Sequence, residues 1–328
     1  KRKSGMSYRL EDLFRLVQKP GRYTGGEVNS IVKDKEKVNI RFAFCFPDLY
    51  EVGMSHLGMK ILYGLYNREP DIWCERAFMP DTDMEQLMRE NGIKLFGLES
   101  REPIDRFDII GFTLQYELSY TAVLNMLDLA GLPLHSRERD SSYPLVIAGG
   151  PCVSNPEPIA DFFDLFVLGE GEDASLELFE LYRKHKAGGY DKEEFLRDAA
   201  RIEGVYVPSF YNVSYKDDGT IASITPKNGA PAKVRKRIVE DLDSAYYPDR
   251  FVVPFIDIVH DRAMSEVFRG CIRGCRFCQA GFIYRPVREK SPGVIDAQSR
   301  ALCENTGYEE FSLSSLSTSD YSRIEELL

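Results

Sequence analysis

The sequence predicts an α/β protein in which a doubly wound parallel sheet of the Rossmann-like type is followed by a second, incomplete α/β unit. Apolar runs, such as residues 38–46 and 107–114, recur along the first half of the chain and alternate with segments of helical periodicity. Strands that are apolar along their whole length are typical of parallel sheets that helices cover on both faces. The length of 328 residues suggests two domains, or one domain and a fragment.

The elements of the first α/β unit are expected in a regular order. The segment 55–66 should be a helix, because Leu57, Ile61 and Leu65 recur on one face. The helix expected at 118–131 should end at a glycine, Gly131. A further helix is expected at 174–185, and strands are expected at 38–46, 93–98, 107–114, 145–148 and 163–168.

The second half of the chain predicts smaller units. Segments 205–211 and 213–225 should form an antiparallel appendage, since Asp218-Gly219 is a hairpin signal. Residues 227–262 are polar and interrupted by prolines, which indicates a connector. A strand at 264–269, a helix at 294–304 and a strand at 310–317 should follow. The predicted domains are an N-terminal extension (1–37, with an amphipathic stretch at 10–17), an α/β domain (38–186), an appendage with connector (187–262) and a C-terminal unit (263–328).

Three cysteines follow the strand expected at 264–269, with the spacing C-x3-C-x2-C: Cys271, Cys275 and Cys278. Three thiolates on one tight loop can hold three irons of a [4Fe–4S] cluster and leave the fourth iron without a protein ligand. Gly270 and Gly274 would let the loop curl around a bulky cluster, because glycine tolerates positive φ angles. The spacing therefore predicts an iron–sulfur centre with an open position.

Two other interpretations of the cysteine loop stay open. A zinc site would need a fourth ligand, which Cys303 or His260 can supply. The loop would then be a zinc or iron–sulfur module that mediates an interaction without catalysis. A disulfide is less satisfactory, because three clustered cysteines leave one unpaired.

The cysteine loop resembles the cluster loop of the radical S-adenosylmethionine (radical SAM) superfamily. The resemblance implies that Cys271, Cys275 and Cys278 bind a [4Fe–4S] cluster whose free iron chelates SAM. Reductive cleavage of SAM then yields a 5′-deoxyadenosyl radical that abstracts hydrogen from a substrate. Phe277 fits the aromatic position near the adenine. The segments that carry the wider resemblance, to an uncharacterised bacterial branch, are 46–58, 148–151, 155–158 and 284–289.

The resemblance also implies a fold and a set of partners. It implies a cobalamin-binding-like α/β domain before the first βα units of a radical SAM partial TIM barrel. A complete barrel has more strands than this sequence holds, so we expect a fragment with little activity by itself. The implied partners are SAM, an external electron donor and an unknown substrate, which can be RNA, protein or a small molecule. Methylation and methylthiolation are among the implied reactions.

Cobalamin is a possible second cofactor of the α/β domain. Ligands of open α/β sheets sit at the carboxyl ends of the strands, where Gly149 and Gly150 would allow close approach. Cobalamin domains of the base-off type use a D-x-H-x-x-G motif, but here Tyr50 stands between Asp48 and Gly53 at the histidine position. Three readings follow: cobalamin without a protein ligand to cobalt, a corrinoid carrier, or a fold without cofactor.

The end of the second strand of the C-terminal unit departs from the resemblance. A Gly-Gly-Glu-like turn that holds the SAM amino group is replaced here by Ser317-Thr318-Ser319 and Asp320. The carboxylate of Asp320 can receive the ammonium group as a charge-assisted hydrogen bond. Alternatively, Asp320 or Ser319 caps the next helix, expected near Ser322.

The net charge of −10 argues against a protein that binds nucleic acid with its whole surface. A local basic cluster nevertheless surrounds the cysteine loop. It can balance the charge of thiolates and of the SAM carboxylate, or bind RNA. Its members are Arg269, Arg273, Arg276, Arg285, Arg288 and Lys290.

The cysteine usage indicates a reducing compartment. The seven cysteines do not form a secreted disulfide pattern, and Cys45, Cys74 and Cys152 are expected to be small buried residues. The first residues are polar and predict no signal peptide, and no apolar run is long enough to span a membrane. A cytoplasmic protein without membrane contact is therefore expected.

Overall fold

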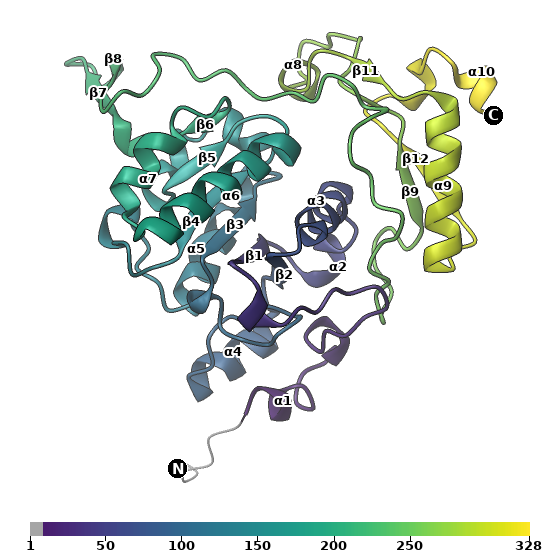
Figure 1. The fold of residues 1–328 in the computed structure, drawn as a ribbon, viewed down its shortest axis with the longest axis horizontal. Helices are drawn as coiled ribbons and strands as arrows, with labels where there is room; N and C mark the ends of the chain where they lie inside the picture. The colour runs from purple at the N-terminus through teal and green to yellow at the C-terminus, as the bar shows by residue number, and fades with distance from the viewer. Residues whose placement is uncertain (1–8) are drawn as a thin grey trace.

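The computed structural model describes residues 9–328 of the chain. Residues 1–8, which begin the predicted N-terminal extension and were expected to hold no signal peptide, lie outside the described residues. An α/β domain forms one side of the molecule, and a lobe of C-terminal residues forms the other (Figure 1). Within residues 9–328, no helix combines the length and the apolar composition that a membrane crossing needs.

A six-stranded sheet organises the α/β domain, with the order β2-β1-β3-β4-β5-β6. The first five strands are parallel, and β6 pairs antiparallel with β5. The order 2-1-3-4-5 is that of a doubly wound sheet, so the predicted fold class is confirmed, and the topological switch lies between β1 and β3. The strands are β1 (Ile40–Phe46), β2 (Ile72–Phe78), β3 (Ile109–Thr113), β4 (Leu145–Gly149), β5 (Leu165–Val167) and β6 (Val205–Tyr206).

Helices cover the sheet and begin and end at the expected kinds of residue. The side chain of Asp81 caps one helix, which ends at Gly92 with a φ of 66°. The helix predicted at 118–131 ends at Leu129 and is followed by Gly131, which has a φ of 73°. The helices of this half are α1 (Leu10–Leu13), α2 (Tyr50–Gly53), α3 (Leu57–Arg68), α4 (Thr82–Asn91), α5 (Tyr120–Leu129), α6 (Gly171–Gly188) and α7 (Lys192–Ala199).

Short 3₁₀ turns connect many of these elements. They are η1 (Pro20–Arg22), η2 (Lys35–Lys37), η3 (Ile104–Arg106), η4 (Glu117–Ser119), η5 (Ser136–Glu138), η6 (Pro151–Ser154), η7 (Glu157–Phe162), η8 (Pro208–Phe210) and η9 (Thr318–Asp320). Two of them, η4 and η6, are the first elements after β3 and β4, at the carboxyl edge of the sheet.

The strand predicted at 93–98 is wrong, because that segment makes only an isolated bridge from Phe96 to Pro103. The edge strand is instead β2, whose charged residues Glu75 and Arg76 break the apolar pattern. Both side chains are buried and paired: Glu75 with Arg41, and Arg76 with Glu27 and Glu99. Buried ion pairs therefore disguise a fully buried strand as a polar segment.

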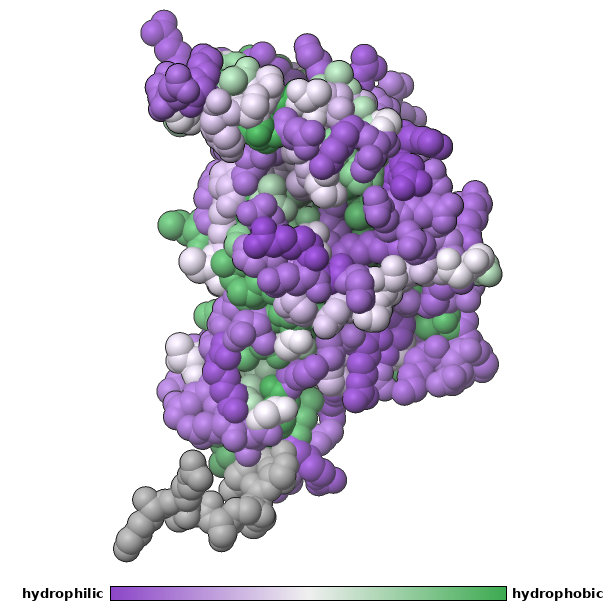
Figure 2. Space-filling view, turned by 90° about the vertical axis from the view of Figure 1, so that its left-hand side faces the viewer, coloured by the Kyte–Doolittle hydropathy of each residue, from purple (hydrophilic) through white to green (hydrophobic). Residues whose placement is uncertain are grey.

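The appendage also differs from the prediction at its start. Residues Val205–Tyr206 join the main sheet as β6, where Tyr206 pairs with Phe166. Only β7 (Tyr211–Tyr215) and β8 (Ile221–Pro226) form the separate hairpin. The connector then crosses from this hairpin to the C-terminal lobe along one end of the domain (Figure 1). The face on the hairpin side is mainly hydrophilic, with dispersed apolar groups (Figure 2).

The C-terminal lobe contains one parallel βαβ unit, as predicted for the start of a barrel. Strands β9 and β12 are parallel neighbours, and α9 connects them. A short antiparallel pair, β10 with β11, closes the base of the cysteine loop. The elements are β9 (Ala263–Glu266), β10 (Phe268–Arg269), α8 (Ala280–Ile283), β11 (Arg288–Glu289), α9 (Pro292–Thr306), β12 (Phe311–Ser314) and α10 (Ile324–Leu327).

Candidate functional site at the carboxyl edge of the sheet

The loops that follow β1 and β3 are tied together across the topological switch. The hydroxyl of Tyr116, after β3, donates a hydrogen bond to a carboxylate oxygen of Asp48, after β1. This bond to Asp48, with partial burial, raises the pKa of Tyr116 to about 12. The edge where ligands of doubly wound sheets bind is therefore bridged by two polar side chains.

The two glycines after β4, Gly149 and Gly150, have different roles. Gly150 has a φ of 97°, and a Cβ atom there would lie 2.7 Å from the carbonyl oxygen of Leu114. This position must therefore be glycine, because the loop that follows β3 passes too close to leave room for a side chain. Gly149 is partly exposed, and a Cβ there would meet only the carbonyl of Val167, at 3.8 Å. Backbone at Gly149 is consequently open to an incoming ligand.

Two side chains near the histidine position of the cobalamin motif, Tyr50 in that position and His56 three residues after Gly53, both serve other purposes. Tyr50 is buried, donates its hydroxyl to Glu27 at 2.9 Å and packs on the ring of Phe78. His56 caps α3, its Nδ1 accepting a hydrogen bond from the Met59 amide at 3.0 Å. Burial lowers the pKa of His56 to about 4, so its imidazole is neutral near pH 7.

The cysteine loop leaves β10 and returns to β11. Cys271 and Cys278 are partly exposed, Cys275 is exposed, and all three are free thiols. The amide of Arg273 donates to Cys271 Sγ at 3.5 Å. Positive φ angles at Gly270 (91°) and Gly274 (62°) turn the chain, as the sequence predicted.

Residues 9–328 contain no group of three His, Cys, Asp or Glu side chains that is arranged around a single metal ion. The proposed fourth zinc ligands also lie elsewhere. Cys303 is near the far end of α9, and His260 precedes β9, so both lie at the end of these elements remote from the loop (Figure 1).

The predicted SAM contacts lie on the outside of this loop and beside it. Phe277 is 92% exposed. Asp320 pairs with Arg273 of the cysteine loop, with Nε to Oδ2 at 2.7 Å, and also accepts a hydrogen bond from Ser317. The alternative of a helix cap is wrong, because α10 begins at Ile324 and has no side-chain cap.

The basic cluster is largely neutralised, which the sequence did not reveal. Arg288 forms a bidentate pair with Glu170, both bonds being 2.7 Å long. Arg269 contacts Glu170 at 3.3 Å and Glu172 at 2.6 Å, and it also pairs with Glu266 at 2.9 Å. We call Glu170, Glu172, Glu266, Arg269 and Arg288 the junction network.

Burial and neighbouring charges shift the pKa of Glu170 in the junction network in opposite directions. Burial alone would raise the pKa of Glu170, but the bonds from Arg288 and the charge of Arg269 outweigh it and lower that pKa. Lys290 is almost fully buried beside Glu266, and burial lowers its pKa to about 8. Within residues 9–328, only Arg276 and Arg285 of the basic cluster have neither a salt bridge nor a buried position.

The junction network fastens the cysteine loop to the carboxyl edge of the sheet. Glu170 follows β5 and also accepts a hydrogen bond from the amide of Val239 in the connector, at 2.5 Å. The ammonium group of Lys236 donates to the carbonyl of Ile283 at 2.6 Å. Helix α8 contacts η6, the turn that follows Gly150. The cysteines, the glycine pair and the switch point therefore share one side of the molecule.

Sequence reasoning missed Arg273 as the partner of Asp320, and it missed Arg269 and Arg288 as the partners of Glu170, for which it offered a salt bridge to the connector or a helix cap. Glu170 had a detectable signal, because Gly169-Glu170-Gly171-Glu172 follows a strand at the ligand-binding edge. Arg273 had none beyond its place in the loop, since its partner is 47 residues away.

Residues 58–208 match the model of the family described as "Radical SAM proteins, N-terminal". This part of the chain is therefore similar to the N-terminal part of radical SAM proteins. The matched segment runs from α3 to the turn after β6, so it contains most of the α/β domain but not the cysteine loop.

Two further proteins are similar to this chain. The uncharacterized protein MJ0966 of Methanocaldococcus jannaschii is 27% identical over 248 residues, which cover 75% of this chain and 42% of the relative. The radical SAM methyltransferase TsrM from Kitasatospora setae, solved with tryptophan and a SAM analogue, has a TM-score of 0.52 at 13% identity. That match covers 86% of this chain and 49% of TsrM and shows a shared fold. The chain spans less than half the length of both relatives.

Proposed function

We propose that this chain is part of a radical SAM enzyme whose [4Fe–4S] cluster is held by Cys271, Cys275 and Cys278, with SAM on the fourth iron. One observation carries the proposal. Three free thiols lie on a glycine-hinged loop that ion pairs fasten to the carboxyl edge of the family's α/β domain. Such an edge is where folds of this class bind their ligands.

The donor set of the loop fits an iron–sulfur cluster. The thiols are unpaired, and the Arg273 amide points at Cys271 Sγ, the kind of hydrogen bond that tunes cluster potentials. When bound, the cluster supplies the electron that cleaves SAM and starts hydrogen abstraction from the substrate. The solvent exposure of Cys275 leaves room for a group larger than one ion.

The protein's own residues would position and balance the cofactors. Arg273 neutralises Asp320 beside the loop, so the SAM ammonium would compete with this arginine for the carboxylate. Phe277 would turn its exposed ring toward the adenine. Arg276 and Arg285 provide positive charge close to thiolates and to the SAM carboxylate. The proposed setting is the cytoplasm, with an external electron donor and a substrate that can be RNA, protein or a small molecule.

A corrinoid at the sheet edge is the second proposed cofactor. The open backbone at Gly149 supports it, together with the switch point bridged by Tyr116 and Asp48. Because Tyr50 points into the core and the Nδ1 of His56 is engaged, we propose binding without a protein ligand to cobalt. Corrinoid retention that survives Tyr50→Phe and disappears in a Gly149→Leu variant would support this arrangement. Equal retention by both variants would contradict it.

The deciding experiment is anaerobic reconstitution of the chain with iron and sulfide. We expect about four irons per chain and an EPR spectrum of the reduced form that changes when SAM is added. Cys275→Ala should lose the cluster, whereas Cys303→Ala, a cysteine outside the loop, should keep it. One zinc per chain, or a cluster that ignores SAM, would overturn the proposal and favour a structural module.

A further inference from the structure

A separate cavity of about 210 Å³ lies between α3 and the connector. One wall is a single face of α3, with Met59, Lys60, Tyr63, Gly64 and Arg68. The opposite wall is the connector segment 246–252. At Gly64 a Cβ atom would lie 2.6 Å from the hydroxyl of Tyr246, so the connector approaches the helix as closely as glycine permits.

Lys60 is the unusual residue of this cavity. Its side chain is 7% exposed, and within residues 9–328 its Nζ has no hydrogen-bond partner. The ammonium group lies 4.9 Å from the centre of the Phe251 ring, and the negative charge of Asp261 acts on it without a hydrogen bond. A buried cation without an acceptor is costly, because nothing replaces its hydration.

The other polar groups of the inner wall are already satisfied. Arg76 is paired with Glu27 and Glu99. The amide of Asn67 bonds to the backbone of Cys74 in both directions. Tyr63 accepts a hydrogen bond from the amide of Ile31. Lys60 is consequently the buried cation of this wall that has no partner among the described residues, whereas Arg68 is exposed at the rim with its guanidinium over the ring of Tyr246.

The other residues that line the cavity indicate the chemical character of the rest of the ligand. Ile31, Met54, Met59, Phe251 and Val252 make the cavity mainly apolar. One buried cation without an acidic partner favours a single negative charge, since a dianion would bring a second charge that no other buried group of the lining neutralises.

We propose that this cavity binds a small monocarboxylate with an apolar or aromatic body, whose carboxylate accepts a hydrogen bond from Lys60. The apolar body would lie against Met54, Met59 and Phe251. A charge-assisted bond of this kind supplies orientation, and burial of the body supplies most of the affinity. The site is distinct from the cysteine loop and does not depend on the proposed radical chemistry.

The test uses benzoate as the probe and methionine methyl groups as reporters. The 328-residue chain is labelled with [¹³C-methyl]methionine and titrated with benzoate, without any cluster. We expect saturable shifts of Met54 and Met59, which line the cavity, and unchanged signals from Met84 and Met126 in the sheet domain's core. Benzamide, a neutral molecule of the same shape, should bind at least about ten-fold more weakly.

Two variants decide the role of the amine. Lys60→Met keeps an unbranched apolar chain, should fold as well as the original, and should weaken benzoate binding about ten-fold or more. Lys184→Met, an exposed lysine elsewhere, should change nothing. Absence of saturable shifts at Met54 and Met59, or equal affinity of benzoate for Lys60→Met, would overturn the inference. Folding of Lys60→Met is checked by its unchanged Met84 and Met126 signals.

Discussion

The α/β domain and the C-terminal lobe are held by different forces. The domain has a continuous apolar core that runs through all six strands of its sheet. The lobe has two small clusters, one around Val267 and Ile295 and the other around Phe251 and Leu302. Its contact with the domain at the cysteine loop is instead made by the junction network. The domain is thus stabilised by burial, whereas the loop is positioned by charge.

This difference suits what each region has to do. Apolar burial stabilises strongly but without direction. Buried ion pairs add little net stability, because desolvation offsets their attraction, yet breaking one partner is costly. The bidentate contact of Arg288 with Glu170 therefore fixes the orientation of the loop base more than it strengthens the fold.

The largest expected effect comes from the core of the sheet. Phe166 on β5 is fully buried and packs against Phe163. Phe166→Ala should lower the free energy of unfolding of the α/β domain by about 3–5 kcal/mol, through lost burial and a new cavity. Urea denaturation followed by circular dichroism measures this.

The matched variant in the lobe is Phe268→Ala, a residue that is 4% exposed. We expect it to loosen the lobe and leave the main transition of the domain in place. If both variants shift one common transition equally, the two regions form a single cooperative unit and the comparison fails.

A smaller effect is expected from the junction network. Glu170→Gln removes the charge that Arg269 and Arg288 share, and the side chains of Glu170 and Arg288 are only 13% and 9% exposed. Local stability of the segment 268–290 should fall by about 3 kcal/mol. Hydrogen exchange of peptides from this segment measures the change.

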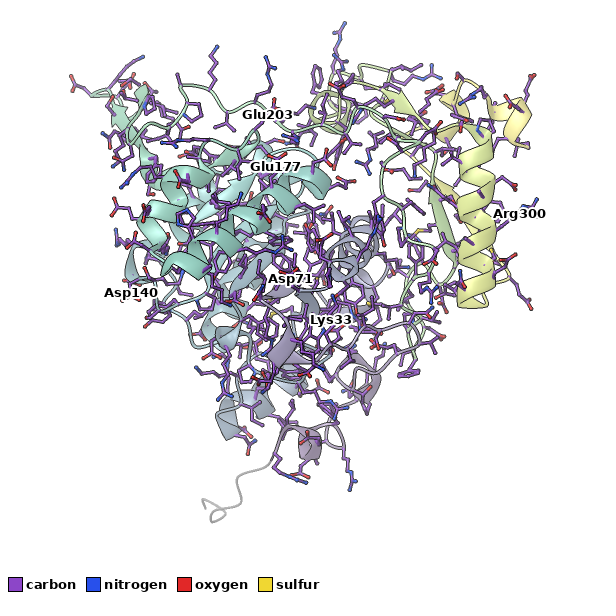
Figure 3. All side chains as sticks on the ribbon, viewed as in Figure 1. Lys33, Asp71, Asp140, Glu177, Glu203 and Arg300 are labelled. Atoms are coloured by element: carbon purple, nitrogen blue, oxygen red, sulfur yellow. The ribbon has the colours of Figure 1, made fainter. Side chains whose placement is uncertain are left out.

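The control for this variant is Glu177→Gln. Glu177 and Glu203 flank Arg237 of the connector near the same end of the domain (Figure 3). Glu177 is 46% exposed, so its loss should cost no more than about 1 kcal/mol. If both variants lose hydrogen-exchange protection equally, the stability of this segment depends on the total charge at this end of the molecule and not on the specific contacts of Glu170.

The smallest effect is a dependence on pH. The pKa of Glu170 is lowered in the folded protein from its ordinary value of 4.5. Its contribution is therefore complete above about pH 4.5 and is lost as the pH falls through the lowered pKa. Protection of the segment 268–290, measured relative to the intrinsic exchange rate at each pH, should fall under acid conditions in the original chain and change less in Glu170→Gln. An identical acid response in both proteins would assign the effect to other carboxylates.

Local patterns in the sequence were sufficient to predict the regular helices and strands that these patterns span. The apolar run that became β1 and the periodicity of α3 predicted both elements, because strand and helix periods are short-range properties. The turn glycines Gly131, Gly270 and Gly274 were likewise predicted and have positive φ angles. Cys45, Cys74 and Cys152 are buried, as predicted.

Charged residues were misread where their partners are distant. Strand β2 was missed because Glu75 and Arg76 look like surface residues until the strands and loops that hold their partners are assembled. Helix α7 was missed for a related reason: its charged residues hide the buried pair Phe195 and Leu196.

By itself, the sequence determined the alternation of strands and helices and the three-thiol loop, because each depends on residues that are near neighbours in the chain. Only the tertiary structure decided which charges meet. Glu170 and Arg288 are 118 residues apart, and Glu172 and Arg269 are 97 apart. Electrostatic pairing depends on distance in space and on burial, and neither can be read from the separation of residues along the chain.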